Sequence, residues 1–257
     1  MDYTGRIPSY IQLYVFDLDG TLVDSLADLS DSVNEILGRS GLPSIDSGTV
    51  RRFVGNGARN LLYRSFAFSA QKAGDLCPPH IADCGVLDDP DPGTVALRLD
   101  RYPGFNRLID AVMPDYREIY WANCALKTDF YPGIREWLAK LSADGCTLAV
   151  LSNKPEKSSV RILSCLESDD LFDAILGPET TGVLKPDPEG IRILLARTGI
   201  PASRTVMIGD SPVDIETGRR AGVLVCGITG GFGDEGEIRK IGCDILIERR
   251  EESLLPG

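Results

Sequence analysis

The chain has 257 residues, of which 38 are acidic and 27 are basic, so its formal net charge is −11 at pH 7. With 43% hydrophobic and 25% charged residues it has the composition of a globular protein, which excludes a disordered, a collagenous or a membrane-spanning chain. The acidic balance makes nucleic acid and anionic membranes poor partners, and we expect neither.

Short apolar runs alternate with amphipathic stretches along the chain. The runs are continuous and rich in Val, Ile and Leu, which is typical of strands buried on both faces of a parallel sheet. We predict strands at 13–16, 147–151, 173–176, 205–208, 223–228 and 244–247. Apolar residues recur at helical spacing at 133–142, 157–166, 188–198 and 212–221. This alternation predicts an α/β fold with a doubly wound parallel sheet.

The first predicted strand is followed by the sequence DLDGT at 17–21, in which Asp17 and Asp19 stand two residues apart. Ligands of open α/β sheets bind outside the carboxyl ends of the strands, where both carboxylates can reach one site. One carboxylate of such a pair can attack as a nucleophile while the other carries a proton. Both are also hard oxygen ligands for Mg²⁺. The alternative is a capped turn, for which a single Asp would be enough.

A mainly helical region follows and interrupts the alternation. Helical patterns lie at 25–37, 49–68 and 106–126, and we find no good strand between 24 and 127. Within this region, 77–103 lacks periodicity and carries clustered Pro and Gly, which predicts a long irregular loop. We therefore predict an α/β core formed by 1–23 and 128–257, with 24–127 as a helical insert.

Three potential zinc ligands, Cys77, His80 and Cys84, stand at the start of the irregular segment. Their spacing matches no standard zinc module and no fourth ligand is evident nearby, so we expect loop residues there. The seven cysteines are scattered and odd in number, and the first ten residues have no apolar core like that of a secretory signal. These features favour reduced thiols and a cytoplasmic location.

Two polar groups with less specific signals come later in the chain. Ser152 and Asn153 follow the predicted strand 147–151, and both could donate hydrogen bonds to a phosphoryl oxygen. A serine in this position is more commonly a loop or cap residue. Lys185 precedes a proline-rich helix start and could bring one positive charge into an acidic site. Taken alone, Lys185 would be expected in solvent.

A second strand end delivers further carboxylates. Asp210 follows the strand predicted at 205–208 after Gly209, which permits a close backbone approach, and Asp214 lies four residues further on. Asp210 could complete a Mg²⁺ site, and Asp214 could orient a neighbouring group. Ser211 and the proline after it also fit the start of a helix, and both interpretations can hold together.

These residues together meet the needs of phosphoryl transfer. Several carboxylates near a phosphate repel one another, and Mg²⁺ and a lysine offset that charge. The reaction otherwise requires mainly positioning and charge neutralisation in line with the attacking oxygen. The sequence supplies a nucleophile, a proton carrier, a metal site, a hydroxyl donor and a lysine, and all but the lysine immediately follow a predicted strand.

In these motifs, their order and their separation, nearly the whole chain resembles the haloacid dehalogenase superfamily of phosphohydrolases. The resemblance implies that Asp17 is the nucleophile and forms an aspartyl phosphate. It implies that Asp19 protonates the leaving group and then activates water. Because dehalogenases of the family lack this second carboxylate, Asp19 indicates a phosphatase.

The resemblance also implies the groups that bind the substrate. Ser152 and Lys185 would hold the phosphoryl group, and Thr21 and Asn153 would contribute to the same substrate site.

The one cofactor that the resemblance implies is Mg²⁺. It would bind Asp17, the backbone carbonyl of Asp19, and Asp210. Asp214 and Ser211 would support this metal site.

The helical insert resembles the cap domain of the family, which closes over the site, excludes bulk water and reads the leaving group. Within it, 53–62 resembles the substrate loop of phosphoglycolate phosphatases, and 227–233 is also similar to that subgroup. The substrate-binding residues implied here are Gly55, Asn56, Gly57 and Arg59. Glycine amides could approach a small ligand, and Arg59 could pair with a carboxylate. The alternative is a helix–loop–helix turn with Arg59 in solvent.

We therefore expect a Mg²⁺-dependent phosphatase for a small phosphorylated metabolite, with 2-phosphoglycolate as the first candidate, acting as a monomer or a homodimer. A phosphomutase similar to β-phosphoglucomutase would share the machinery but return the phosphoryl group to a sugar. A non-catalytic binding module on the same fold is the third hypothesis. The intact carboxylates of Asp17, Asp19 and Asp210 disfavour it.

Overall fold

The computed structural model describes residues 7–84 and 102–249, and the chain divides into two compact units. One unit, here called the core unit, is drawn from residues up to 25 and from 128 onward. The other, the helical unit, is drawn from 26–127.

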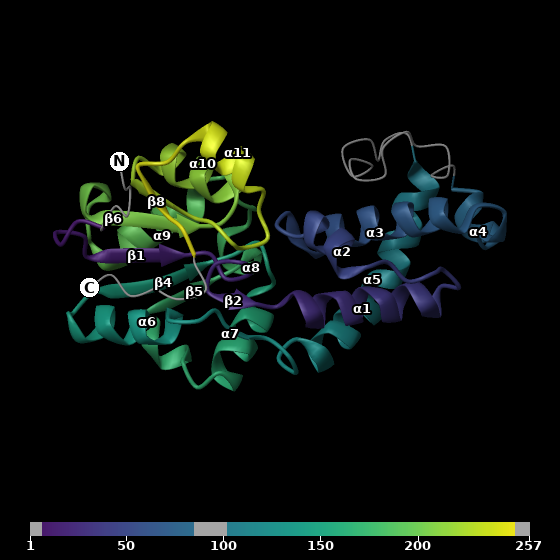
Figure 1. The fold of residues 1–257 in the computed structure, drawn as a ribbon, viewed down its shortest axis with the longest axis horizontal. Helices are drawn as coiled ribbons and strands as arrows, with labels where there is room; N and C mark the ends of the chain where they lie inside the picture. The colour runs from purple at the N-terminus through teal and green to yellow at the C-terminus, as the bar shows by residue number, and fades with distance from the viewer. Residues whose placement is uncertain (1–6, 85–101, 250–257) are drawn as a thin grey trace. The chain divides into compact units, whose positions relative to one another are not determined.

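A six-stranded parallel sheet forms the centre of the core unit (Figure 1). Its strands are β1 (Leu13–Phe16), β4 (Thr147–Leu151), β5 (Ala174–Leu176), β6 (Thr205–Gly209), β7 (Leu224–Ile228) and β8 (Ile245–Ile247). Their order is β5-β4-β1-β6-β7-β8. Each lies within one residue of its predicted bounds. Every residue of β1 and β6 is buried, as their continuous apolar runs predict. The predicted doubly wound α/β fold is confirmed.

Helices cover both faces of this sheet. They are α6 (Ile134–Ala143), α7 (Glu156–Cys165), α8 (Pro178–Thr181), α9 (Glu189–Thr198), α10 (Pro212–Ala221) and α11 (Glu235–Ile241), with 3₁₀ turns η5 (Asp169–Leu171) and η6 (Ala202–Arg204). Successive side chains of a strand point to opposite faces. In β1, Leu13 and Val15 pack with Ile191 of α9. Phe16 instead meets the ring of Trp137 in α6 edge-on, with centroids 5.5 Å apart.

The register brings the ends of the three central strands to one level. Phe16 in β1 pairs with Val150 in β4 on one side and with Ile208 in β6 on the other. The residues that follow these three strands therefore leave the sheet at the same edge. After β5 the chain crosses back over β1 to begin β6, so the order of strands reverses beside β1. Open α/β sheets bind their ligands at this kind of reversal.

A small antiparallel pair of strands was not predicted from the sequence. β2 (Val23–Asp24) pairs with β3 (Asp129–Phe130), where the chain leaves the core unit and returns to it. The backbone N–H of Tyr131 extends the pair by donating to the carbonyl of Leu22 at 3.0 Å. Strands of two residues carry too little periodicity to be recognised from sequence.

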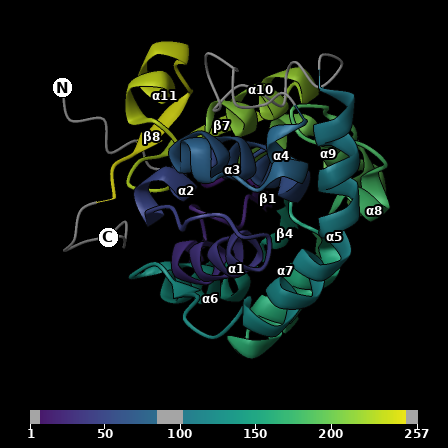
Figure 2. The same ribbon diagram turned by 90° about the vertical axis from the view of Figure 1, so that its right-hand side faces the viewer.

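The helical unit contains α1 (Leu26–Arg39), α2 (Ser47–Phe53), α3 (Gly57–Ala73), α4 (Pro79–Ala82) and α5 (Pro103–Asn123), with a 3₁₀ turn η1 (Gly74–Leu76). Within it α1 packs against α3 and α5 (Figure 2). The helical pattern predicted at 49–68 is divided into α2 and α3 by a turn, which lies within the loop expected at 53–62. Gly55 and Gly57 adopt φ of 111° and 82° at this break, in the region that favours glycine.

Most of the segment predicted as an irregular loop, 77–103, lies outside the described residues, since 85–101 are not described. The described part contains the short helix α4. The thiol of Cys84 lies 3.3 Å from the backbone carbonyl of His80. Among the residues that the structure describes, Cys77, His80 and Cys84 do not form a group of metal-ligating atoms.

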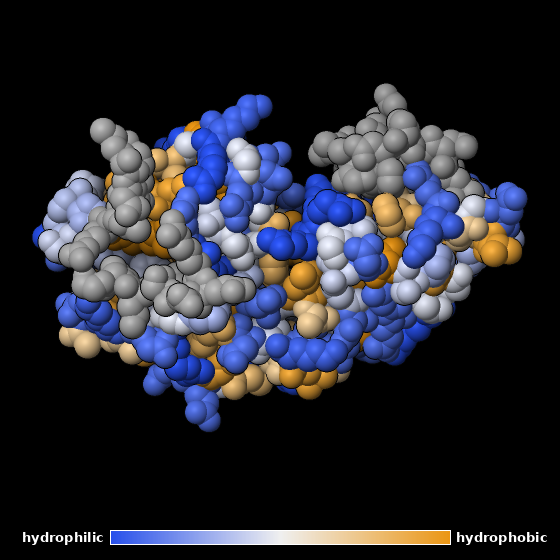
Figure 3. Space-filling model, viewed as in Figure 1, coloured by the Kyte–Doolittle hydropathy of each residue, from blue (hydrophilic) through white to orange (hydrophobic). Residues whose placement is uncertain are grey.

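Hydrophilic residues cover much of the face shown in Figure 3, and the hydrophobic areas of the described residues on it are small and separate. In the ranges 7–84 and 102–249, the helices are too short or too polar to cross a bilayer.

Candidate active site

Asp17 stands directly after β1, and its backbone N–H donates to the carbonyl of Ile208 at 2.9 Å. The chain then turns, with the N–H groups of Leu22 and Val23 both donating to Leu18. Gly20 lies in this turn with φ of 84°. A Cβ atom at Gly20 would overlap the carboxylate of Asp210, which follows β6. The glycine therefore permits both a left-handed turn and the close approach of this carboxylate.

Asp210 belongs to a cluster of three buried acids, together with Asp17 and Asp214. One oxygen from each lies within 4.8 Å of the others. Asp210 follows β6, and Asp214 lies in the first turn of α10, where it forms a capping box with Ser211. In residues 7–84 and 102–249 this is the only such cluster of potential metal ligands.

Asp210 is held from two sides. The hydroxyl of Thr21 donates to its Oδ1 at 2.8 Å. The backbone N–H groups of Phe232 and Gly233 donate to its Oδ2 at 2.6 and 3.0 Å. Thr21, which was predicted to bind the substrate, therefore donates its hydroxyl hydrogen bond to Asp210 in this structure.

Lys185 supplies the positive charge within the cluster. Its Nζ lies 2.6 Å from Oδ1 of Asp214 and 2.8 Å from Oδ1 of Asp17. Its backbone is fixed by Asn153, whose side-chain amide donates to the Lys185 carbonyl at 3.1 Å and accepts from the Lys185 N–H at 2.7 Å. Asn153, predicted to bind substrate, thus contacts the backbone of the lysine.

The pKa values reflect this crowding of buried charge. Burial, with added repulsion from Asp214 and Asp210, raises the pKa of Asp17 to about 7 although Lys185 opposes the rise. Burial and Asp214 likewise raise the pKa of Asp210. Burial alone would lower the pKa of Lys185, but Asp17 and Asp214 raise it above its ordinary value. The cluster therefore favours additional positive charge.

The residues fit a divalent cation. Asp17 is buried, and Nζ of Lys185 lies 2.8 Å from its Oδ1, which leaves carboxylate lone pairs for a further cation. Carboxylate oxygens are the hard ligands that Mg²⁺ prefers, and a cation among them would favour their ionised forms. Asp17 and Asp210, two of the predicted ligands, offer oxygens here together with Asp214.

The carboxylate of Asp19 lies apart from the cluster and is held by a different lysine. Nζ of Lys154 lies 2.6 and 2.7 Å from its two oxygens, and the hydroxyl of Ser25 also donates to it. Lys154 is buried, and its backbone N–H donates to Oγ of Ser152 at 3.3 Å. Lys154 is not among the predicted site residues, although it directly follows Ser152 and Asn153 at the end of β4.

The remaining predicted residues belong to the helical unit. Gly55, Asn56 and Gly57 form the turn between α2 and α3. Arg59, in the first turn of α3, is ion-paired with Asp110 of α5 and donates to Oδ1 of Asn106 at 2.7 Å.

Arg59 is also fixed by a buried tyrosine of its own helix. Its Nε donates to the hydroxyl of Tyr63 at 3.0 Å, and its guanidinium lies 5.3 Å from the centroid of the Tyr63 ring. The guanidinium is thus bound to groups of α3 and α5, while the side chain remains 45% exposed beside a turn between two helices, as the alternative hypothesis expects.

The geometry above agrees with comparisons to known proteins. The family model for haloacid dehalogenase-like hydrolases matches residues 14–228. The chain belongs to this family. A phosphoglycolate phosphatase of Rhodospirillum rubrum is 34% identical over 221 residues, which cover 86% of this chain and 80% of the relative. One of Pseudomonas savastanoi pv. phaseolicola is 30% identical over 258 residues, covering 99% and 81%.

A solved structure supports the same assignment for this haloacid dehalogenase-like hydrolase. The crystal structure of a predicted phosphoglycolate phosphatase from Haemophilus somnus has a TM-score of 0.75 and 29% identity, covering 93% of this chain and 94% of that one. The predicted family and the predicted enzyme class, a phosphoric monoester hydrolase, are confirmed.

Proposed function

We propose that the chain is a Mg²⁺-dependent phosphatase that hydrolyses a small phosphomonoester through an aspartyl phosphate on Asp17. The observation that carries this proposal is the buried cluster of Asp17, Asp210 and Asp214 with Lys185 between two of its members. Such a site offers an attacking oxygen together with the charge neutralisation that phosphoryl transfer requires.

In the first half-reaction a carboxylate oxygen of Asp17 attacks phosphorus. A P–O bond to Asp17 forms, the bond to the leaving oxygen breaks, and Asp19, in its protonated form, donates a proton to that oxygen and becomes a carboxylate. In the second half-reaction water attacks phosphorus while Asp19 accepts its proton. Phosphate leaves and the carboxylate of Asp17 is restored.

Other residues of the site bind and orient. Lys185 contributes positive charge next to Asp17, and Asn153 fixes its position through the backbone. Ser152, which is buried after β4, would donate a hydrogen bond to the phosphoryl group. A divalent cation held by Asp17 and Asp210, with Asp214 in support, would neutralise charge on the phosphoryl oxygens.

For the substrate we propose 2-phosphoglycolate. The relatives at 30% and 34% identity are named phosphoglycolate phosphatases. Arg59 adds support from the chain itself, because it already binds a carboxylate, that of Asp110, in an exposed ion pair. A substrate carboxylate would take the place of Asp110 at the guanidinium.

A substrate panel tests the proposal. Phosphate release is measured from 2-phosphoglycolate, glycerol phosphate, glucose phosphates and p-nitrophenyl phosphate, each with Mg²⁺ and with EDTA. We expect release only with Mg²⁺ and the highest kcat/KM for 2-phosphoglycolate. A requirement for a bisphosphate activator without net phosphate release would indicate the phosphomutase instead. An absence of turnover on every substrate would indicate the binding module.

A further inference from the structure

An arginine far along the chain reaches the turn that follows Asp17 and Asp19. Arg249 comes shortly after β8, at the edge of the sheet, whereas the turn follows the central strand β1. Its guanidinium donates to the backbone carbonyls of Thr21 at 2.6 Å, Gly20 at 3.1 Å and Gly230 at 3.3 Å. One side chain thus joins the turn to the glycine-rich loop at 229–233.

Both segments that Arg249 joins hold Asp210. The turn provides the hydroxyl of Thr21, and the loop provides the N–H groups of Phe232 and Gly233. The loop also packs tightly on Asp210, since a Cβ atom at Gly231 would overlap its carboxylate. A small displacement of either segment would therefore move the carboxylate or cost it a hydrogen bond.

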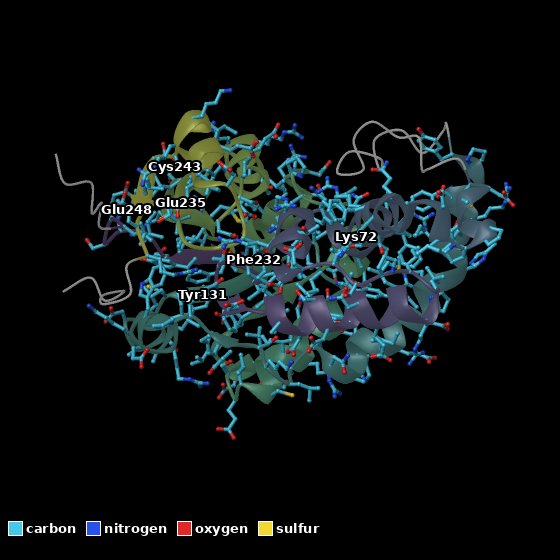
Figure 4. The ribbon with its side chains drawn as sticks, turned by 45° about the vertical axis from the view of Figure 1, so that its right-hand side comes forward. Lys72, Tyr131, Phe232, Glu235, Cys243 and Glu248 are labelled. Carbon is cyan, nitrogen blue, oxygen red and sulfur yellow. The ribbon has the colours of Figure 1, made fainter. Side chains whose placement is uncertain are left out.

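Arg249 is itself held in place by an aromatic ring. Its guanidinium lies 3.5 Å from the ring centroid of Tyr131, a geometry in which a cation is attracted to the ring. The backbone N–H of Tyr131 donates a hydrogen bond to the carbonyl of Leu22 in the same turn. Tyr131 and Phe232 are labelled in Figure 4. A planar guanidinium with several donors suits a position between three carbonyls better than an ammonium does.

We propose that Arg249 is a positioning residue for the metal site: it fixes the turn at Gly20 and Thr21 against the loop at 229–233, and thereby the carboxylate of Asp210. Arg249 acts through these backbone groups and contacts neither substrate nor metal. The inference rests on the proposed function only in taking Asp210 as a ligand of a divalent cation.

The test compares Arg249→Met and Arg249→Lys with a matched control, Arg239→Met. Arg239 is an exposed arginine of α11 that is ion-paired with Glu248, the neighbour of Arg249 in sequence. The readouts are Mn²⁺ affinity by electron paramagnetic resonance, hydrogen exchange of peptides covering 18–24 and 229–234, and KM and kcat with saturating Mg²⁺.

We expect Arg249→Met to weaken Mn²⁺ binding about tenfold, the usual effect of losing a group that orients a metal ligand. Exchange in both peptides should become faster, while KM at saturating Mg²⁺ stays near the wild-type value. Arg249→Lys should recover only part of the affinity. The Arg239→Met variant should match wild type in every readout.

Wild-type Mn²⁺ affinity and wild-type exchange in Arg249→Met would overturn the inference. Equal losses in Arg239→Met would also overturn it, because they would assign the effect to the segment after β8 as a whole. If Arg249→Met does not fold, the exchange of Arg249→Lys decides between the same outcomes. Exchange and Mn²⁺ affinity remain informative if the wild type releases no phosphate, a result that would defeat the proposed function alone.

Discussion

The two cations singled out from the sequence occupy opposite environments in the two units. The side chain of Lys185 in the core unit is 3% exposed and lies between Asp17 and Asp214. The side chain of Arg59 in the helical unit is 45% exposed, and its partner Asp110 is 53% exposed. Removing one member of a buried pair strands a charge in the interior, whereas exposed pairs exchange partners at little cost. Lys185 can therefore hold one fixed position between Asp17 and Asp214, whereas Arg59 can exchange Asp110 for the carboxylate of a substrate.

The largest effect should follow from Asp17→Asn. The substitution keeps the shape of the side chain but removes the attacking oxygen, so we expect kcat to fall by at least about 10⁴-fold. Steady-state phosphate release measures the loss, and circular dichroism checks that the fold is retained. Near-normal Mg²⁺-dependent turnover in this variant would reject Asp17 as the nucleophile.

Lys185→Met tests the buried cation and should lower the free energy of unfolding. Without the ammonium, Asp17 and Asp214 face each other uncompensated, and we expect the free energy of unfolding in EDTA to fall by about 3 kcal/mol. Mg²⁺ should restore part of this loss.

Arg59→Met is the matched control for Lys185→Met. Because its ion pair is exposed, we expect a change in the free energy of unfolding below about 1 kcal/mol. Urea denaturation measures both variants. Equal changes for the two would contradict the distinction between a fixed and an exchangeable cation.

The raised pKa of Asp17 predicts a pH-dependent stability. Because the pKa is about 7 in the folded chain and near 3.8 when unperturbed, the unfolded state gives up this proton first, and stability falls as pH rises from 3.8 to about 7 and levels off above it. Between pH 5 and pH 8 in EDTA, wild type should lose roughly 2 kcal/mol relative to Asp17→Asn. Mg²⁺ should reduce the difference by favouring the ionised carboxylate. A difference independent of pH would show that Asp17 titrates normally.

The last prediction concerns KM and the exposed pair. If a substrate carboxylate replaces Asp110 at Arg59, then Arg59→Met should raise KM for 2-phosphoglycolate about tenfold, in line with the loss of a hydrogen-bonded charge. Asp110→Asn should lower the same KM by removing the competing carboxylate. Neither variant should change KM for p-nitrophenyl phosphate. Unchanged kinetics of Arg59→Met on 2-phosphoglycolate would defeat the substrate proposal.

The sequence was most informative where local pattern and position coincide. Buried parallel strands are continuous apolar runs, so the strands and the polar residues after them could be predicted, Asp17 and Asp210 among them. The helical pattern at 49–68 alone does not show the break at Gly55 and Gly57, whereas the resemblance of 53–62 to a substrate loop does indicate a turn there.

Two pairings across long separations were not predicted. Lys154 and Asp19 are 135 residues apart, and Arg249 and Thr21 are 228 apart. Such contacts depend on the order of the strands in the sheet, which no local pattern encodes. The contact of Asn153 with the backbone of Lys185 belongs to the same class.

Trapping of the covalent intermediate tests the central claim most directly. Wild-type enzyme is mixed with ³²P-labelled substrate and Mg²⁺ and quenched with acid within the first turnover. We predict label on the protein that hydroxylamine releases, as expected of an acyl phosphate, and no label on Asp17→Asn. Turnover by the wild type without label on the protein, or an equal amount of label on Asp17→Asn, would contradict an aspartyl phosphate on Asp17.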